Sequence, residues 1–286
     1  MIQQSELRTP HHHLKLKILI ALTVSIMILA VLLHSLMYDA RNYREEMRNL
    51  VQSISTYGKE TKPDFIVIPQ NGPELLTTNG EPDGPLSRAY LDAIDGVGRE
   101  ALFYGYASDN IATPASERNY LVTFMDAAEN NGVEVLVTDY CLTHSFVDDS
   151  YTQNAAKGYM SFAADHRELD NIPAYPENPY NFNDSNVTSL AEAKNFLYLI
   201  NPGSFTSKDA FLGAVKETNY DVIIIDLFYD GVALGSSEVA SLRNKANGGF
   251  SPDNSIHEYW RGRRLSVLLA DRMGNKSAFV ASNRKY

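Results

Sequence analysis

The sequence is poor in cysteine and has no excess of basic residues. Cys141 is the single cysteine among 286 residues, which excludes an internal disulfide framework and a thiolate metal cluster. Lysine and arginine number 25 against 35 aspartates and glutamates, giving a net charge of -10. A phosphate backbone requires a basic surface, so we expect no nucleic acid partner.

Motifs for cofactors and metals are also missing. No glycine-rich phosphate loop follows a predicted strand, and the GVGR stretch at 96–99 lacks that spacing. The three histidines at 11–13 are typical of a polar flank, although they could bind metal. Asp165 and His166 are adjacent, but no further ligands follow at metal spacing. We therefore expect no cofactor and no metal.

A long apolar run lies near the N-terminus. Residues 18–37 read ILIALTVSIMILAVLLHSLM, which at about 1.5 Å per residue matches a hydrocarbon core of roughly 30 Å. The exit from this run lacks a small-residue cleavage pattern, which favours an uncleaved signal anchor over a cleaved signal peptide. The sequence thus predicts a cytoplasmic segment at 1–17, a transmembrane helix at 18–37 and an extracytoplasmic globular part at the cell membrane.

Apolar residues at helical spacing follow this run. Tyr43, Met47, Leu50, Val51 and Ile54 fit one helix face. We expect 38–62 to form a docking helix and a linker.

Alternating strands and helices are predicted from residue 63 onward. The expected strands are 64–69, 134–139, 196–200 and 220–228, with weaker candidates at 102–106 and 159–163. The expected helices are 86–94, 117–129, 207–218 and 237–245. Continuous apolar strands separated by helices indicate an α/β fold with a buried parallel sheet. Both a barrel and a doubly wound sheet fit this pattern.

Two of the predicted strands end in an aspartate. Asp139 follows Val135 and Val137, and Asp226 follows Val222 and Ile224, each at a spacing of two. Buried carboxylates are costly unless they are paired or used, and the carboxyl ends of barrel strands carry active sites. The pair suits acid/base chemistry on a glycosidic bond. The alternative is that each aspartate caps a helix or pairs with a lysine.

Further polar side chains occur near the predicted strand ends. Tyrosines and amides suit sugars, because they offer stacking faces and neutral hydrogen bonds. Each residue taken singly is also common in ordinary loops. The candidate substrate-binding residues are Gln70, Asn71, Tyr104, Tyr106, Tyr140 and Asp165.

Residues 43–249 resemble a known family. The matching stretches include REEMRNLVQSIS, PDFIVIPQNG, VLVTDYC, KGYMSFAADHRELDNIP, AKNFLYLINP, TNYDVIIIDLFYDG and SLRNKANGG. Together they resemble the TM1410-like glycoside hydrolases of the endo-α-1,4-polygalactosaminidase type. The resemblance implies a TIM-type (β/α) barrel outside the cytoplasm, hydrolysis of an amino-sugar or related polysaccharide, and Asp139 and Asp226 as catalytic residues.

The sequence departs from this family after residue 249. The family continues into a strand and the motif SIGEAEDYRYYW, whose glutamate is expected at the active-site mouth. Residues 251–286 instead hold seven basic against three acidic residues, a charge of +4 that leaves -14 for the preceding 250 residues. We expect this segment to be foreign to the fold.

A reading-frame slip explains the departure. Permitted codons for 255–262, read from their second base, encode AYMSIGE, and the agreement extends over some two dozen codons. We therefore interpret 251–286 as an out-of-frame tail and 63–250 as the first part of an incomplete barrel. An inactive glycoside hydrolase-like chain is the expected result. The alternative is a membrane-tethered, non-catalytic carbohydrate-binding or relic protein.

Overall fold

The computed structural model describes residues 10–39, 42–226, 228–243, 265–269 and 279–281, and side-chain surroundings for 17–33, 42–226 and 228–243. The chain divides into two compact units, Met1–Glu46 and Met47–Tyr286.

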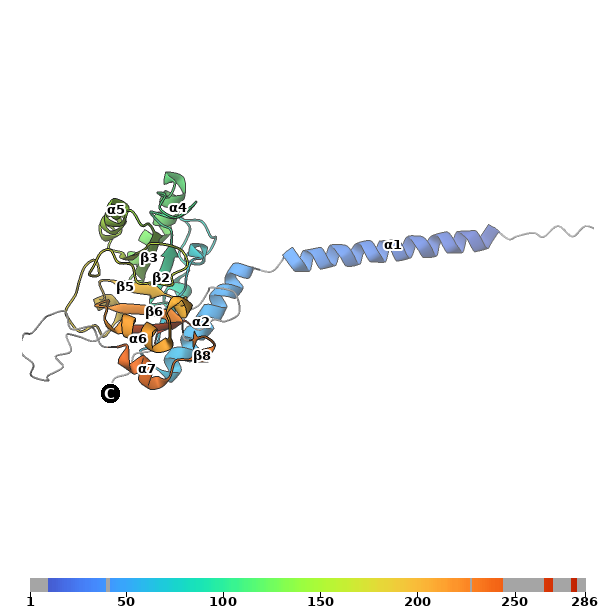
Figure 1. Cartoon of the computed structure of the whole chain (residues 1–286). Coiled ribbons are helices and arrows are strands. Elements are labelled where there is room, and N and C mark those ends of the chain that lie inside the picture. The colour runs from blue at the N-terminus through green and yellow to red at the C-terminus, as the bar shows by residue number, and fades with distance from the viewer. Residues whose placement is uncertain (1–9, 40–41, 227, 244–264, 270–278, 282–286) are drawn as a thin grey trace, which may run out of the picture. The chain divides into compact units, whose positions relative to one another are not determined.

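The first unit consists mainly of helix α1 (Pro10–Asp39), drawn in blue in Figure 1. Within the described residues, no helix is both long enough and apolar enough to cross a membrane. The predicted transmembrane anchor at 18–37 and the location at the cell membrane were therefore wrong.

The second unit is a mixed α/β structure (Figure 1). Its strands are β1 (Ile66–Ile68), β2 (Gly96–Glu100), β3 (Glu134–Tyr140), β4 (Met160–Ala164), β5 (Phe196–Leu199), β6 (Val222–Asp226), β7 (Phe228–Tyr229), β8 (Val232–Ala233), β9 (Leu265–Leu269) and β10 (Phe279–Ala281). Its α-helices are α2 (Tyr43–Thr61, which begins in the first unit), α3 (Arg88–Leu91), α4 (Ala115–Glu129), α5 (His144–Ala155), α6 (Lys208–Lys216) and α7 (Ser236–Ser241). Short 3-10 turns lie at Pro73–Leu75, Leu190–Glu192 and Pro202–Ser204.

The strands form two main sheets. One is the parallel sheet β2-β3-β4, and the other has the order β1-β10-β9-β6-β5, in which β10 is antiparallel to both neighbours. A parallel bridge from Gln70 to Gly98 joins β1 to β2, and β4 lies next to β5. These eight strands thus follow one another in a circuit. Strands β7 and β8 form a separate hairpin.

The predicted incomplete TIM-type (β/α) barrel was wrong for the described residues, which form a mixed α/β structure. β9 and β10 come from the segment interpreted as an out-of-frame tail, yet they occupy the place between β6 and β1. Strand pairing uses backbone N–H and C=O groups that every residue except proline supplies, so unpaired sheet edges can accept a segment of almost any sequence. The predicted slip near residue 250 lies outside the described residues.

The predicted weak strand at 102–106 is not a strand, and β2 instead lies before it at Gly96–Glu100. Its residues read GVGRE, and the two glycines remove the apolar signal of a strand. A Cβ on Gly96 would lie 3.0 Å from the Glu134 carbonyl oxygen, and one on Gly98 would lie 1.8 Å from Gln70 Oε1. The glycines are therefore needed where the backbone and the Gln70 side chain come close.

Residues of β1, β3 and β4 alternate between two apolar clusters, whereas both faces of β5 and β6 belong to the first of these clusters. An inner core, enclosed by the strands, contains Ile66 and Ile68 of β1, Leu136 of β3 and Phe162 of β4. A helix-side core collects the intervening residues, including Val67, Val97, Val135 and Val137. Helices α4 and α5 lie beside β3 and β4 on that outer side (Figure 1). The period-two alternation of the strands produces this division.

Helices α3, α6 and α7 are shorter than predicted, and α4 begins two residues before its predicted start. Ser207 accepts a hydrogen bond from Ala210 N at 3.1 Å and caps the start of α6. Helix α5 was not predicted, because its polar sequence HSFVDDSYTQNA has little apolar periodicity.

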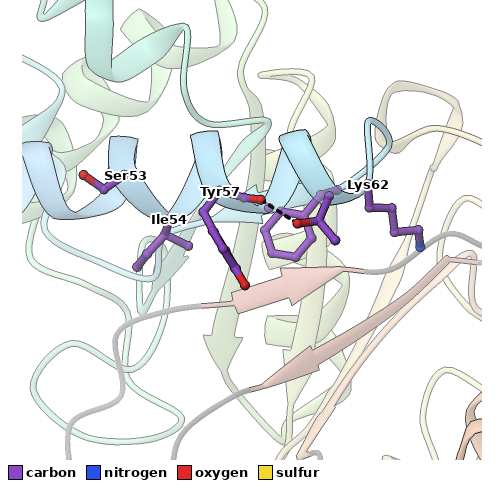
Figure 2. A pocket seen from close by; sticks show the side chains of 7 residues that line it. Ser53, Ile54, Tyr57 and Lys62 are labelled. Carbon is purple, nitrogen blue, oxygen red and sulfur yellow. Dashed lines mark hydrogen bonds between the residues drawn. The ribbon is translucent and has the colours of Figure 1, made fainter.

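Helix α2 confirms the predicted helix within 38–62. Arg48 is buried in it and donates from Nε to the Leu75 carbonyl oxygen at 2.9 Å. A largely apolar groove along α2 (Figure 2) is lined by Ser53, Ile54, Tyr57, Gly58, Thr61, Lys62 and Phe65.

Candidate functional site

Five side chains at the carboxyl ends of the strands share the inner face of the circuit. Gln70 continues the alternation of Ile66 and Ile68, and Tyr140 continues that of Leu136. Tyr198 of β5 is opposite Ile224 of β6, so Asp226, two residues further on, lies on the face of Tyr198. Glu100 ends β2 and contacts this set. We call these five residues the inner edge: Gln70, Glu100, Tyr140, Tyr198 and Asp226.

Glu100 is the best-connected member of the inner edge. Gln70 Nε2 donates to Glu100 Oε1 at 3.0 Å, and the Tyr140 side chain also hydrogen-bonds to Glu100. Burial raises the pKa of Tyr140, and the negative charge of Glu100 raises it further. Burial also raises the pKa of Tyr198, and the negative charge of Glu100 raises it further. Glu100 thus lies close to groups from β1, β3 and β5.

The backbone is strained beside two inner-edge residues. Asn71, directly after Gln70, has φ 61°, and Ala101, directly after Glu100, has φ 55°. Neither residue is a glycine, so each conformation costs free energy that the surrounding contacts must offset. Asn71 Oδ1 accepts from Glu100 N at 3.2 Å, which links the two turns.

Asp226 lies at the end of β6 and is partly exposed. Its Oδ1 accepts a hydrogen bond from Phe228 N at 2.9 Å. The register of β6 with β5 gives this predicted catalytic residue the same face as Tyr198 of the inner edge.

Asp139 points the other way, toward α5. It follows Val135 and Val137 of the helix-side core and has no exposed surface. Its Oδ1 accepts from Phe103 N and Tyr104 N at 2.9 and 3.1 Å, and its Oδ2 accepts from Ser150 Oγ and Asn154 Nδ2 at 2.7 and 3.2 Å. Burial raises the pKa of Asp139, while these four donors act in the opposite direction. The geometry gives Asp139 a structural role.

The predicted substrate-binding residues do not come together at one place. Gln70 and Tyr140 belong to the inner edge, and Asn71 supports it. Tyr104 is buried, and its hydroxyl donates to Asp149 Oδ2 at 2.7 Å. Tyr106 is exposed and hydrogen-bonds to Glu117.

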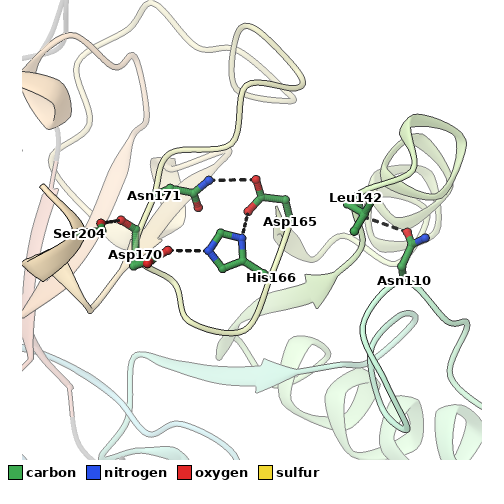
Figure 3. Close-up of polar contacts among 7 residues, drawn as sticks. All are labelled: Asn110, Leu142, Asp165, His166, Asp170, Asn171 and Ser204. Atoms are coloured by element: carbon green, nitrogen blue, oxygen red, sulfur yellow. Dashed lines mark hydrogen bonds and ion pairs between the residues drawn. The ribbon is translucent and has the colours of Figure 1, made fainter.

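Asp165 lies in a polar loop after β4, shown in Figure 3. Asp165 Oδ1 lies 2.7 Å from His166 Nδ1, and Asp170 Oδ1 lies 2.5 Å from His166 Nε2, so the imidazole ring is held between two carboxylates. The hydrogen bond that His166 donates to Asp170 is the main cause of the raised pKa of His166. Among the described residues, no group of three or more histidine, cysteine, aspartate or glutamate side chains is arranged to hold a metal ion.

The same loop brings a cation to the inner edge. The Arg167 guanidinium lies 4.6 Å from the centroid of the Tyr140 ring and pairs through Nε with Asp109 Oδ1 at 2.5 Å. Cation–π contact of this kind fixes the ring that binds Glu100.

Sequence reasoning missed Glu100, Tyr198 and Arg167. Glu100 follows Gly96 and Gly98 at period two, which would have placed it on one strand face had β2 been identified. Tyr198 was visible only as an apolar residue inside FLYLI. Arg167 carries no sequence signal, because its position depends on the loop.

Comparison with known proteins gives one distant match. No protein-family model matches the chain. The chain is 31% identical over 144 residues to "Uncharacterized protein MJ1477" of Methanocaldococcus jannaschii. The match spans 47% of this chain and 39% of that protein, well under half of the relative's length. This relative's name assigns it no activity.

Proposed function

We propose that this chain binds a polysaccharide at the inner edge and hydrolyses a glycosidic bond there. The proposal is supported by the register of β5 and β6, which gives Asp226 the same face as Tyr198, and by the interaction of Tyr198 with Glu100, the hydrogen-bond partner of Gln70 and Tyr140. An amide and phenol groups provide hydrogen bonds to sugar hydroxyls, and a carboxyl provides the proton transfer that cleavage requires. The family resemblance of residues 43–249 supports amino-sugar polysaccharides as the substrate class.

A second candidate is carbohydrate binding without turnover. It is favoured by the burial of Asp139, which cannot reach a sugar while four donors hold it. The missing SIGEAED motif favours the same outcome.

The test compares cleavage with binding. The full chain is incubated with soluble α-1,4-linked polygalactosamine, and new reducing ends and binding heat are measured, with dextran as the neutral control polymer. We expect reducing ends from the wild-type chain and a loss of about 10²–10⁴-fold in kcat for Asp226→Asn. Binding without new reducing ends would select the second candidate, and absence of both would refute the proposal.

A further inference from the structure

We propose that Glu100 is the second carboxyl of the site and that it acts as the base opposite Asp226. This inference rests on the proposed function, because it assigns a residue to that reaction. Glu100 thereby takes the place of Asp139, which the sequence predicted as the catalytic partner of Asp226.

The first argument is position. In the circuit β1-β2-β3-β4-β5-β6-β9-β10, strand β6 is the fourth neighbour of β2 in either direction. Glu100 and Asp226 therefore end strands on opposite sides of the inner core. Two carboxyls that face each other across the interior can flank a sugar from its two sides.

The second argument is the environment of Glu100. It accepts a hydrogen bond from Gln70 Nε2 at 3.0 Å and one from the Tyr140 side chain. These two donors hold the carboxyl group of Glu100 in a fixed position at the end of β2. In this inference Glu100 activates the attacking water and Asp226 protonates the leaving oxygen.

The third argument is how firmly the carboxylate is positioned. Gln70 fits against β2 only because Gly98 has no side chain, and Arg167 holds the Tyr140 ring from the β4 loop. The left-handed conformation of Ala101 directly follows Glu100. Strain and preorganised donors concentrated on one side chain are typical of a functional residue.

The reaction balances as follows. Asp226 gives its proton to the bridging glycosidic oxygen, and the C1–O bond breaks with its electron pair moving to that oxygen. Glu100 removes a proton from a water molecule, whose oxygen bonds to C1 from the opposite face. One water is consumed, and the proton on Glu100 returns to Asp226 through solvent. Because the two carboxyls come from opposite strands, we expect room for this water and an inverted anomeric centre.

The experiment uses Glu100→Gln in the full chain, with α-1,4-linked polygalactosamine as the probe. Gln keeps the size of the side chain but cannot accept the proton from water. We expect kcat to fall about 10²–10⁴-fold with little change in KM, and azide to restore cleavage as a glycosyl azide product. Glu134→Gln, at the amino end of neighbouring β3, is the matched control and should keep wild-type kcat.

The outcomes separate this inference from the proposed function. Wild-type cleavage together with unchanged kcat in Glu100→Gln would overturn the role of Glu100 and leave the proposed function standing. Lost cleavage without azide rescue, or retention of configuration in the wild-type product, would also overturn the base role. No cleavage by the wild-type chain would remove the proposed function, and this inference with it.

Discussion

Asp139 offers the sharpest test of the difference between a structural and a catalytic carboxylate. Its side chain is fully buried and ties the backbone of Phe103 and Tyr104 to Ser150 and Asn154 of α5. Substitution should therefore reduce the free energy of unfolding and leave the chemistry of the folded chain unchanged.

The size of the effect follows from the four donors. Asp139→Ala leaves two backbone N–H groups and two side-chain donors without their acceptor inside the protein, and we expect a loss of about 3–5 kcal/mol. Asp139→Asn keeps one oxygen for the N–H groups of Phe103 and Tyr104, but its amide faces the Asn154 amide. Asn154 Oδ1 has no hydrogen-bond partner among the described residues, so this side chain can turn to accept. We therefore expect a smaller loss of about 1–2 kcal/mol.

The assay is urea unfolding of the full chain followed by circular dichroism, alongside the cleavage and binding measurements on the folded variants. Asp226→Asn is the matched control, because this carboxyl is partly exposed and accepts one identified hydrogen bond. It should change the free energy of unfolding by less than about 1 kcal/mol while losing activity. Unchanged stability of Asp139→Asn combined with lost cleavage would refute the structural role.

Two further predictions concern a glycine and a histidine. Gly98→Ala places a Cβ 1.8 Å from Gln70 Oε1, so this substitution should displace Gln70 and lower kcat. Gly213→Ala in α6 is the control, because a Cβ there meets nothing within 4 Å. It should stabilise the chain by about 0.5–1 kcal/mol. Equal effects of the two substitutions on unfolding and kcat would contradict the packing argument. The hydrogen bond to Asp170 is the largest cause of the raised pKa of His166. The stabilisation that protonated His166 gives the folded chain should therefore be complete below the unfolded pKa of about 6.5 and disappear as the pH rises through the folded pKa. Urea unfolding of the wild type and of His166→Gln across this pH range measures the contribution. The same pH dependence of the free energy of unfolding in both proteins would contradict the prediction.

The sequence by itself determined most of the α/β alternation. Apolar runs identified β1, β3, β5 and β6, because buried strands need continuous side chains of this kind. β4 also lies where a weak strand was predicted. The helices that became α4 and α6 were found through their apolar periodicity.

The tertiary structure decided which side chains meet. Asp139 and Asp226 both end strands at period two with apolar residues, yet one lies on the helix-side core and the other on the inner edge. Alternation along a strand defines two faces but does not say which one is inside. The pairing partners and the helices packed outside decide that.

Closure of the strand circuit was likewise a tertiary result. β9 and β10 pair through their backbones, so the charge and composition of 251–286 gave no indication of their place in the sheet. Glu100 joined the site for a related reason. Its strand contains two glycines that carry no apolar signal, and their meaning appears only where Gln70 and the Glu134 backbone lie against them.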